Sequence, residues 1–528
     1  MNRRKIALLI PLLLLACNLI TGLPVSTPTR RSLTSMPTTT PSPSLTPLPS
    51  LMPTPSSTLI PPTPVLDLAE QAAAMLPEFV GDIDALQHAT QYAIDAQVTF
   101  DPTQFSASIE GEAQIFFTNP LDDTLNDFVL MLWPNEDQYL SDMQAGPVTI
   151  GGQQIESQLD AQELILSFTL PEPLQPGSNI SISLPFRIQA YGPINSTNPH
   201  RFGITGDVLI APSFFPMVPR FVDGAWQIDD PPPAGDTTNS DIAFFDVSIT
   251  CPADFKLAAS GVEIERLEHD NGTRTQRFVT GPMRDFAFAL GPFARSTRTI
   301  DDITLVGWVL PDHSSDSQRM LRAAANQVQA LNRLVGPYPY PELDLVDAPE
   351  AFGGIEYPGL VYIGTVGTYW LIEPTVHEIA HQWFYALVGN DQLIEPWMDE
   401  AAATYAEVIY YEQTGQVGLA TSLLDDFRAQ VRDHPRSTTP IGLPVEAYPS
   451  DWDYTTFVYV KGALFFEALR QRLGDDLFFE FLNVYFTAQR YGFAEADDFH
   501  NAAEQVCACE LDDLFDIWVY EGGPIYHP

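Results

Sequence analysis

Two histidines and a glutamate near residue 380 have the spacing needed to hold and use a metal ion. The segment HEIAH at 377–381 is an HExxH pattern, and we expect it to lie in a helix from Pro374 to Val388. Residues four apart lie on one face of a helix, so His377 and His381 can both reach one ion. Glu378 lies beside His377, where it can accept a proton from a metal-bound water. The pattern alone also fits a pair of ordinary surface histidines.

A third ligand is available further along the chain. Glu400 stands nineteen positions after His381, in the segment WMDEA at 397–401, which we expect to begin the next helix. Catalytic zinc commonly takes two histidines and one glutamate and leaves the fourth position to water. Glu407 follows on the same helical face, where it would orient a ligand imidazole or lie exposed as an ordinary helix carboxylate. The sequence therefore predicts one Zn²⁺ per chain, bound by His377, His381 and Glu400.

The segment HEIAHQW followed by WMDEAAATYAE resembles the aminopeptidase N family of zinc metallopeptidases (gluzincins), which includes leukotriene A4 hydrolase. Three further segments resemble family motifs in the same order: GPYPY at 336–340, FGGIEYPG at 352–359, similar to the G-x-M-E-N substrate strand, and YVKGA at 459–463, similar to the segment of the catalytic tyrosine. The resemblance covers about residues 90–528 and is strongest from 336 to 463. It implies an aminopeptidase with a thermolysin-like catalytic domain.

The resemblance also implies roles for individual residues. Glu356 would bind the protonated α-amine of a peptide, which confines cleavage to the first residue. Gly353 and Gly354 would let the substrate backbone approach closely, because no side chain intrudes. Glu378 would act as the general base, and Tyr459 would donate a hydrogen bond to the developing oxyanion. Without the resemblance, Tyr459 would be read as a core aromatic residue.

The sequence departs from the family pattern in three places. Tyr357 replaces the Asn of G-x-M-E-N, and Asp399 stands where Asn is usual beside the ligand. The chain ends about 70 residues after Tyr459, so we expect a form without the large C-terminal helical domain and with a more open cleft. A group from the β-rich domain often helps to bind the amine in the family, and the sequence does not show which residue would do so here.

The periodicity of the chain predicts two domains of different class. Alternating apolar residues recur from about Tyr92 to Thr297, as in NISISLPFRI at 179–188, and predict antiparallel strands. A helical segment is expected before them, within 67–86, and helices dominate after Pro311, among them 317–334, 417–433 and 457–473. We therefore expect an α+β multidomain fold, with an N-terminal antiparallel β-rich domain at 67–297 and a mostly helical catalytic domain at 298–528.

The N-terminal residues indicate export. Arg3, Arg4 and Lys5 precede a short apolar run that ends in LLAC at 14–17, which resembles the lipobox of bacterial lipoproteins. We expect 1–17 to be a signal peptide with a lipid anchor on Cys17, an ordinary signal peptide being the alternative. Residues 18–66 are rich in Ser, Thr and Pro and predict a disordered tether. The catalytic part would then lie at the outer face of the membrane.

Charge and cysteine content narrow the function further. With 68 acidic against 25 basic residues the net charge is −43, which makes nucleic-acid binding a poor expectation. Beyond Cys17 the chain has Cys251, Cys507 and Cys509, for which we expect buried thiols or one disulfide to Cys251.

The function expected from all these observations is a zinc aminopeptidase acting on extracellular peptides with a free N-terminus. Two alternatives remain open from the sequence: a zinc endopeptidase with an open cleft, and an inactive peptidase fold serving as a surface-binding lipoprotein. The sequence leaves the oligomeric state open.

Overall fold

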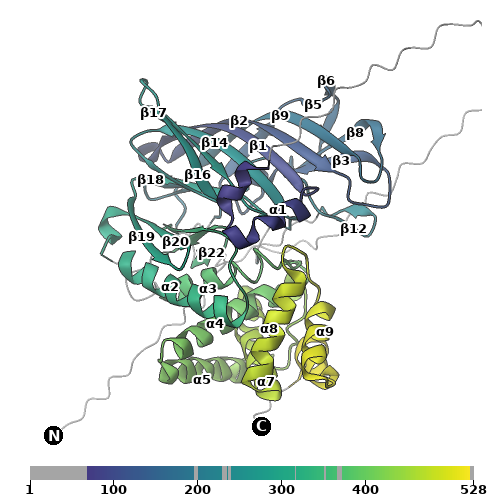
Figure 1. The fold of residues 1–528 in the computed structure, drawn as a ribbon, viewed down its shortest axis with the longest axis vertical. Coiled ribbons are helices and arrows are strands. Elements are labelled where there is room, and N and C mark those ends of the chain that lie inside the picture. The colour runs from purple at the N-terminus through teal and green to yellow at the C-terminus, as the bar shows by residue number, and fades with distance from the viewer. Residues whose placement is uncertain are drawn as a thin grey trace, which may run out of the picture.

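The computed structural model describes residues 68–195, 200–228, 235, 239–315, 317–349, 353–364 and 372–523. The predicted signal peptide, the tether and Cys17 lie outside the described residues. In Figure 1 a β-rich part lies at one end of the molecule and helices lie at the other, with a smaller sheet between them. The expected fold class is thereby confirmed.

A large twisted sheet forms most of the β-rich part (Figure 1). Its strands, in spatial order, are β16 (Val262–Glu268), β17 (Thr273–Val279), β14 (Ala243–Pro252), β1 (Thr90–Asp101), β2 (Ser106–Thr118), β9 (Asn179–Tyr191), β5 (Val148–Ile150) and β6 (Gln153–Ile155), and β4 (Ser141–Ala145) also pairs with β9. The pairings are antiparallel except that β1 runs parallel to β14. Every second residue of β9 from Ile180 to Ala190 is buried, because successive side chains of a strand point to opposite faces.

Smaller sheets complete the β-rich part. One consists of β10 (Gly203–Thr205), β11 (Val208–Pro212), β18 (Ala287–Gly291) and β15 (Lys256–Ala259). Another consists of β3 (Leu125–Met131), β8 (Ile165–Leu174) and β7 (Ser157–Leu159). The third is a hairpin of β12 (Phe221–Val222) and β13 (Ala225–Trp226). Aromatic side chains fill the space between sheets, as where Tyr92 stacks on Phe245 at 5.0 Å and meets the edge of Phe215.

A five-stranded sheet lies between the β-rich part and the helices. Its strands, in spatial order, are β19 (Ala294–Ile300), β20 (Ile303–Val309), β21 (Glu342–Asp347), β23 (Leu360–Ile363) and the short edge strand β22 (Gly354–Ile355). Strands β20, β21 and β23 are parallel, whereas β22 is antiparallel to β23. The domain boundary predicted between 297 and 298 falls inside β19 and stays a prediction.

The helices are α1 (Gly81–Ala85), α2 (Ser317–Leu334), α3 (Ile372–Ala380), α4 (Trp397–Gln413), α5 (Val417–Asp433), α6 (Asp451–Tyr454), α7 (Gly462–Leu473), α8 (Asp475–Gln489), α9 (Ala496–Cys507) and α10 (Asp512–Phe515). The expected bounds of α2 and α5 are confirmed. One apolar core runs through both parts of the molecule, since its buried residues come from the large sheet and from α4 and α7 alike. The two parts are therefore packed together as one body, and residues from both can meet at a site.

Three expected helices differ from the structure. The expected helix 374–388 ends at Ala380, because the chain then turns and Tyr385 adopts a φ of 118°, which an α-helix does not allow. The expected helical segment at 67–86 is a pair of 3₁₀ turns followed by the short α1, since Pro77 prevents one continuous helix. The expected helix 457–473 begins as a π-helix at Thr455–Lys461 and becomes α-helical only from Gly462.

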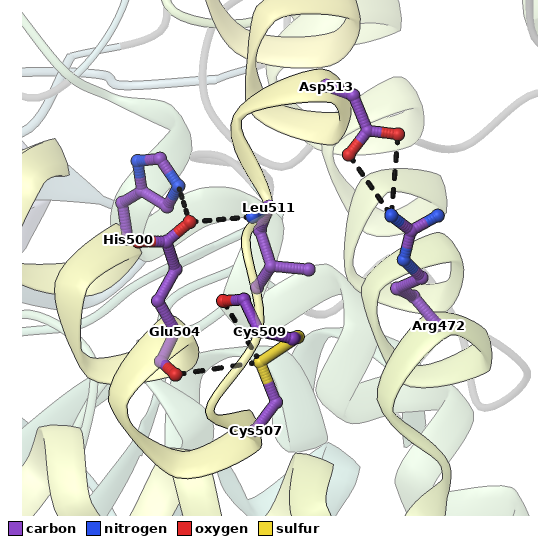
Figure 2. The surroundings of a disulfide bond; sticks show 7 residues. All are labelled: Arg472, His500, Glu504, Cys507, Cys509, Leu511 and Asp513. Atoms are coloured by element: carbon purple, nitrogen blue, oxygen red, sulfur yellow. Dashed lines mark hydrogen bonds and ion pairs between the residues drawn. A yellow bond between two sulfur atoms is a disulfide. The ribbon is translucent and has the colours of Figure 1, made fainter.

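The expected cysteine arrangement is wrong. Cys507 and Cys509 form a disulfide with each other, and Cys251 is a free, buried thiol in β14. Cys507 is the last residue of α9, and Ala508 adopts a left-handed conformation with a φ of 50°, which turns the chain so that the two sulfurs meet. Figure 2 shows this turn, where Glu504 accepts a hydrogen bond of 2.6 Å from the backbone N–H of Leu511.

Among the described residues, no helix combines the length and the apolar content that a bilayer crossing requires.

Candidate active site

Three predicted ligands meet at one point in the interior. Nε2 of His377 lies 3.1 Å from Oε2 of Glu400 and 3.2 Å from Nε2 of His381. Nε2 of His381 lies 3.3 Å from the same oxygen of Glu400. Ligand atoms about 2.0–2.1 Å from a tetrahedral zinc ion lie about 3.3 Å apart, so the three atoms have the spacing of a zinc site.

The outer nitrogens of the two imidazoles fix their tautomers. Nδ1 of His381 lies 3.1 Å from the carbonyl oxygen of Phe384, which can only accept a hydrogen bond, so Nδ1 carries the proton. Nδ1 of His377 lies 3.1 Å from Oε1 of Glu407 and donates to that carboxylate in the same way. Each neutral imidazole then directs the lone pair of Nε2 at the other and at Glu400. In this tautomer the converging lone pairs can bind a cation in place of a proton, and the residues present therefore fit zinc.

Electrostatics at this point favour positive charge. Burial lowers the pKa of His377, but the carboxylates of Glu400 and Glu407 outweigh it and raise that pKa to about 10. Burial would raise the pKa of Glu400, yet hydrogen bonds from His377 and His381 hold it below its usual range. Burial is also the main reason why the pKa of Glu407 lies above its ordinary value. The cluster is a buried site of net negative field that a divalent cation would neutralise.

The local structure explains why these side chains are held so firmly. His377 lies in α3, and the backbone N–H of His381 still bonds to the carbonyl of His377, so the helical spacing persists one residue past the end of α3. Glu400 lies in the first turn of α4, in which every residue from Trp397 to Tyr411 is buried. The packing of α4 against α7 depends on Gly462, because a Cβ at this position would collide with the side chain of Ala401.

The predicted general base, Glu378 of α3, packs against the predicted substrate strand. A Cβ on Gly354 would fall onto the carboxyl group of Glu378, so only glycine leaves this carboxylate its place. We expected this glycine to admit a substrate backbone, and the structure adds a second reason for it. The other predicted glycine, Gly353, accepts a hydrogen bond of 2.9 Å from the N–H of Gly364 across the strand pair. Phe352, the first residue of this motif, lies outside the described residues.

Glu356 lies directly after β22 and close to the metal cluster. One carboxylate oxygen of Glu356, one of Glu378 and one imidazole nitrogen of His381 all lie within 4.8 Å of one another. Glu356 is only 3% exposed. A ligand group held by Glu356 would therefore lie a few ångströms from a metal held by His381.

Two glutamines that sequence reasoning missed hold Glu356 in place. Gln382 accepts a hydrogen bond of 2.9 Å from the N–H of Gly359, and its Nε2 lies 3.4 Å and 3.3 Å from the carbonyls of Glu356 and Tyr357. Gln392 donates from Nε2 to Oε1 of Glu356 at 3.2 Å. Gln382 follows the predicted ligand His381 directly, and this position could have marked it as a site residue. Nothing in the sequence singled out Gln392.

Tyr459 reaches the site from the π-helix. Its hydroxyl donates a hydrogen bond of 2.5 Å to Oε1 of Glu400, and its ring stacks on that of His377 with 5.9 Å between centroids. π-Helical turns are rare and frequently occur at functional sites. The structure thus brings Tyr459 next to the predicted ligands, on the face of Glu400 that the histidines leave open.

Residues 321–518, which include all of these side chains, match the peptidase family M1 domain. The chain contains a peptidase family M1 domain. This confirms the resemblance to the aminopeptidase N family. Among curated proteins the chain is similar to aminopeptidase RNPEPL1 of Homo sapiens, with 29% identity over 41% of this chain and 33% of that protein. It is also similar to aminopeptidase B of Homo sapiens, with 33% identity over 32% of this chain and 28% of that protein. The chain spans about a third of the length of these relatives.

The fold of this M1 chain is shared with solved structures. An M1 zinc metallopeptidase from Deinococcus radiodurans superposes with a TM-score of 0.63 and 21% identity over 83% of this chain and 95% of that chain. A mutant of the Deinococcus enzyme bound to a Tyr-Ser-Ala substrate has a TM-score of 0.61, with 21% identity over 84% of this chain and 96% of that one. At this identity the likeness establishes the two-part fold, a β-rich part followed by a helical M1 domain.

Proposed function

We propose that this chain is a zinc-dependent aminopeptidase that removes single residues from the N-terminus of extracellular peptides. The observation that carries the proposal is the group formed by Glu356, Glu378 and His381, whose ligand atoms lie within 4.8 Å of one another. An ammonium group bound by Glu356 leaves room for about one residue before the peptide carbonyl reaches the metal position. This geometry favours an exopeptidase over an endopeptidase.

Each side chain has a step to perform in this reaction. A zinc ion held by the three ligands would polarise the carbonyl of the first peptide bond and lower the pKa of a bound water. Glu378 would accept a proton from that water and then deliver it to the leaving amine. Tyr459 would turn its hydroxyl from Glu400 to the carbonyl oxygen as negative charge develops there. Glu356 would hold the α-amine throughout, which keeps the scissile bond in register.

The test is cleavage of paired peptides by the purified full chain, with bound zinc quantified. Each peptide with a free N-terminus is paired with its N-acetylated twin. We expect stepwise loss of N-terminal residues from the free peptides only, about one zinc per chain, and no cleavage after chelation until zinc is restored. Internal cleavage of acetylated peptides would show an endopeptidase instead. Bound zinc without any cleavage would favour a surface-binding protein.

The location outside the cell is part of the same proposal and rests on the sequence of residues 1–66. A Cys17→Ala variant expressed beside the unaltered chain in a bacterial host tests it. We expect the unaltered chain in the membrane fraction with a lipid-modified Cys17 by mass spectrometry, and we expect the variant to lose the modification and leave that fraction. Unmodified Cys17 in the unaltered chain would contradict the lipid anchor.

A further inference from the structure

The carboxylate of Glu356 is fixed by a neutral donor. Gln392 donates from Nε2 to Oε1 of Glu356 at 3.2 Å and to Oδ2 of Asp399 at 2.9 Å, so one amide group bridges two carboxylates. All three residues are almost fully buried, with exposures of 3% for Glu356, 2% for Gln392 and 1% for Asp399. The bridging amide donates to both carboxylates at once and so helps to hold these two buried side chains at fixed positions.

The neutrality of this donor matters for amine binding. An arginine or lysine in this place would also orient Glu356, but it would cancel the negative charge that attracts a substrate ammonium group. An amide orients one oxygen of the carboxylate and leaves the charge in place. Asn390 supports the arrangement from the other side, because its Nδ2 donates to Oδ1 of Asp399 at 3.0 Å.

Gln392 is in turn held by the β-rich part of the molecule. Its backbone N–H donates to Oδ1 of Asn239 at 3.2 Å. The neighbouring Asp391 accepts hydrogen bonds from Nδ2 of Asn239 at 2.9 Å and from Nε2 of Gln227 at 2.7 Å. Asp391 also caps its own loop through the N–H groups of Leu393 and Ile394, each at 3.1 Å. The position of Gln392 therefore depends on contacts between the two parts of the chain.

We propose that Gln392 is a positioning residue for amine recognition, which sets the carboxylate of Glu356 and takes its own position from Asn239 through the loop at Asp391. The inference rests on the proposed aminopeptidase function and deepens it. It also assigns the β-rich part a share in binding the amine, although no side chain of that part need touch the substrate.

The test compares Gln392→Met with Gln327→Met in the full zinc-loaded chain. Gln327 is an equally buried glutamine whose Nε2 donates to the carbonyl of Ala406 on α4, at 3.1 Å and away from Glu356, so it controls for loss of a buried amide. The probes are two competitive inhibitors without a cleavable amide bond, leucinol and its counterpart without the amine, 4-methylpentan-1-ol. The inhibition constant of the probe without the amine, divided by that of the probe with the amine, measures what the amine contributes to binding.

We expect Gln392→Met to reduce this ratio about tenfold to hundredfold, the range for losing a hydrogen bond to a charged group, with KM raised more than kcat is lowered. We expect Gln327→Met to leave the ratio unchanged. A folded Gln392→Met variant with the ratio of the unaltered chain would overturn the inference.

A second variant keeps the test decisive if Gln392→Met does not fold. Asn239→Ala removes the contact from the β-rich part and leaves Gln392 and Glu356 themselves unchanged. We expect it to lower the same ratio by a smaller factor. An unchanged ratio in Asn239→Ala would overturn the link to the β-rich part and, with an unfolded Gln392→Met, the whole inference. If the unaltered chain binds both inhibitors equally, the proposed function fails instead.

Discussion

The two sides of the active site are built in different ways. The metal side lies on helices, with His377 in α3, His381 directly after it and Glu400 and Glu407 in the buried part of α4. The amine side lies outside the helices. Glu356 directly follows the two-residue edge strand β22, and it is held by Gln382 and Gln392 from the segment between α3 and α4. Helical spacing aligns the two histidines and the packing of α4 brings Glu400 to them, whereas the amine side needs hydrogen bonds from several segments.

This difference predicts how each side responds to change. Ligands on helices are fixed by the packing of those helices. The metal side should therefore keep its geometry and its turnover with bound zinc when a single polar contact is changed. The amine side has little regular structure of its own, so one lost contact should alter recognition without affecting the metal. Substitutions on either side, and one where the sides touch, can test this contrast.

The largest effect is expected for Glu378→Gln. The variant keeps the shape of the side chain but cannot accept a proton, and loss of a general base costs about 10²- to 10⁴-fold in kcat. Zinc content should not change, because Glu378 is not among the three converging ligands. The measurement is kcat for a free-amine peptide together with zinc per chain. Glu373→Gln on the same helix, where Glu373 accepts a hydrogen bond from Tyr411, is the control and should retain activity.

The next effect is expected where the two sides touch. Gly354→Ala places a methyl group onto the carboxyl group of Glu378 and should displace it by about 1 Å, a shift that can cost about 10²-fold in kcat. Gly307→Ala, in β20 of the same sheet, is the control, since its Cβ would meet the flexible end of Met320 at 3.1 Å. Equal kcat values in the two variants would mean that Glu378 can move away from β22 without loss.

These two sides also mark how far the sequence could be interpreted. The spacing of His377 and His381 follows from helix geometry, Glu400 was found from the ligand set that zinc commonly takes, and the structure places the three ligand atoms together. The position of the loop that carries Gln392 could not be predicted, because its partners Asn239 and Gln227 lie 152 and 164 residues away from Asp391 in sequence. No local pattern encodes such contacts. The end of α3 at Ala380 was missed for the same reason, since Tyr385 is held in its conformation by tertiary packing.

A smaller effect, confined to recognition, is expected for Glu356→Gln. Replacing the carboxylate by an amide removes the charge that attracts the ammonium group, and we expect kcat/KM for free-amine peptides to fall about tenfold to hundredfold. The zinc affinity should stay within about twofold of the unaltered chain. A parallel loss of zinc would mean that the amine side also supports the metal, and the contrast between the two sides would then be wrong.

The smallest effect on turnover is expected for Glu407→Gln. The amide oxygen can still accept the hydrogen bond from Nδ1 of His377, so the imidazole keeps its tautomer and orientation, but the negative charge behind the ligand is lost. Loss of such an outer partner typically lowers metal affinity about tenfold to hundredfold. We therefore expect weaker zinc binding in a competition with a chelator, and nearly unchanged kcat when zinc is saturating. If kcat falls as far as in Glu378→Gln even at saturating zinc, Glu407 takes part in the reaction itself. The metal side would then be less tolerant than its helical construction predicts.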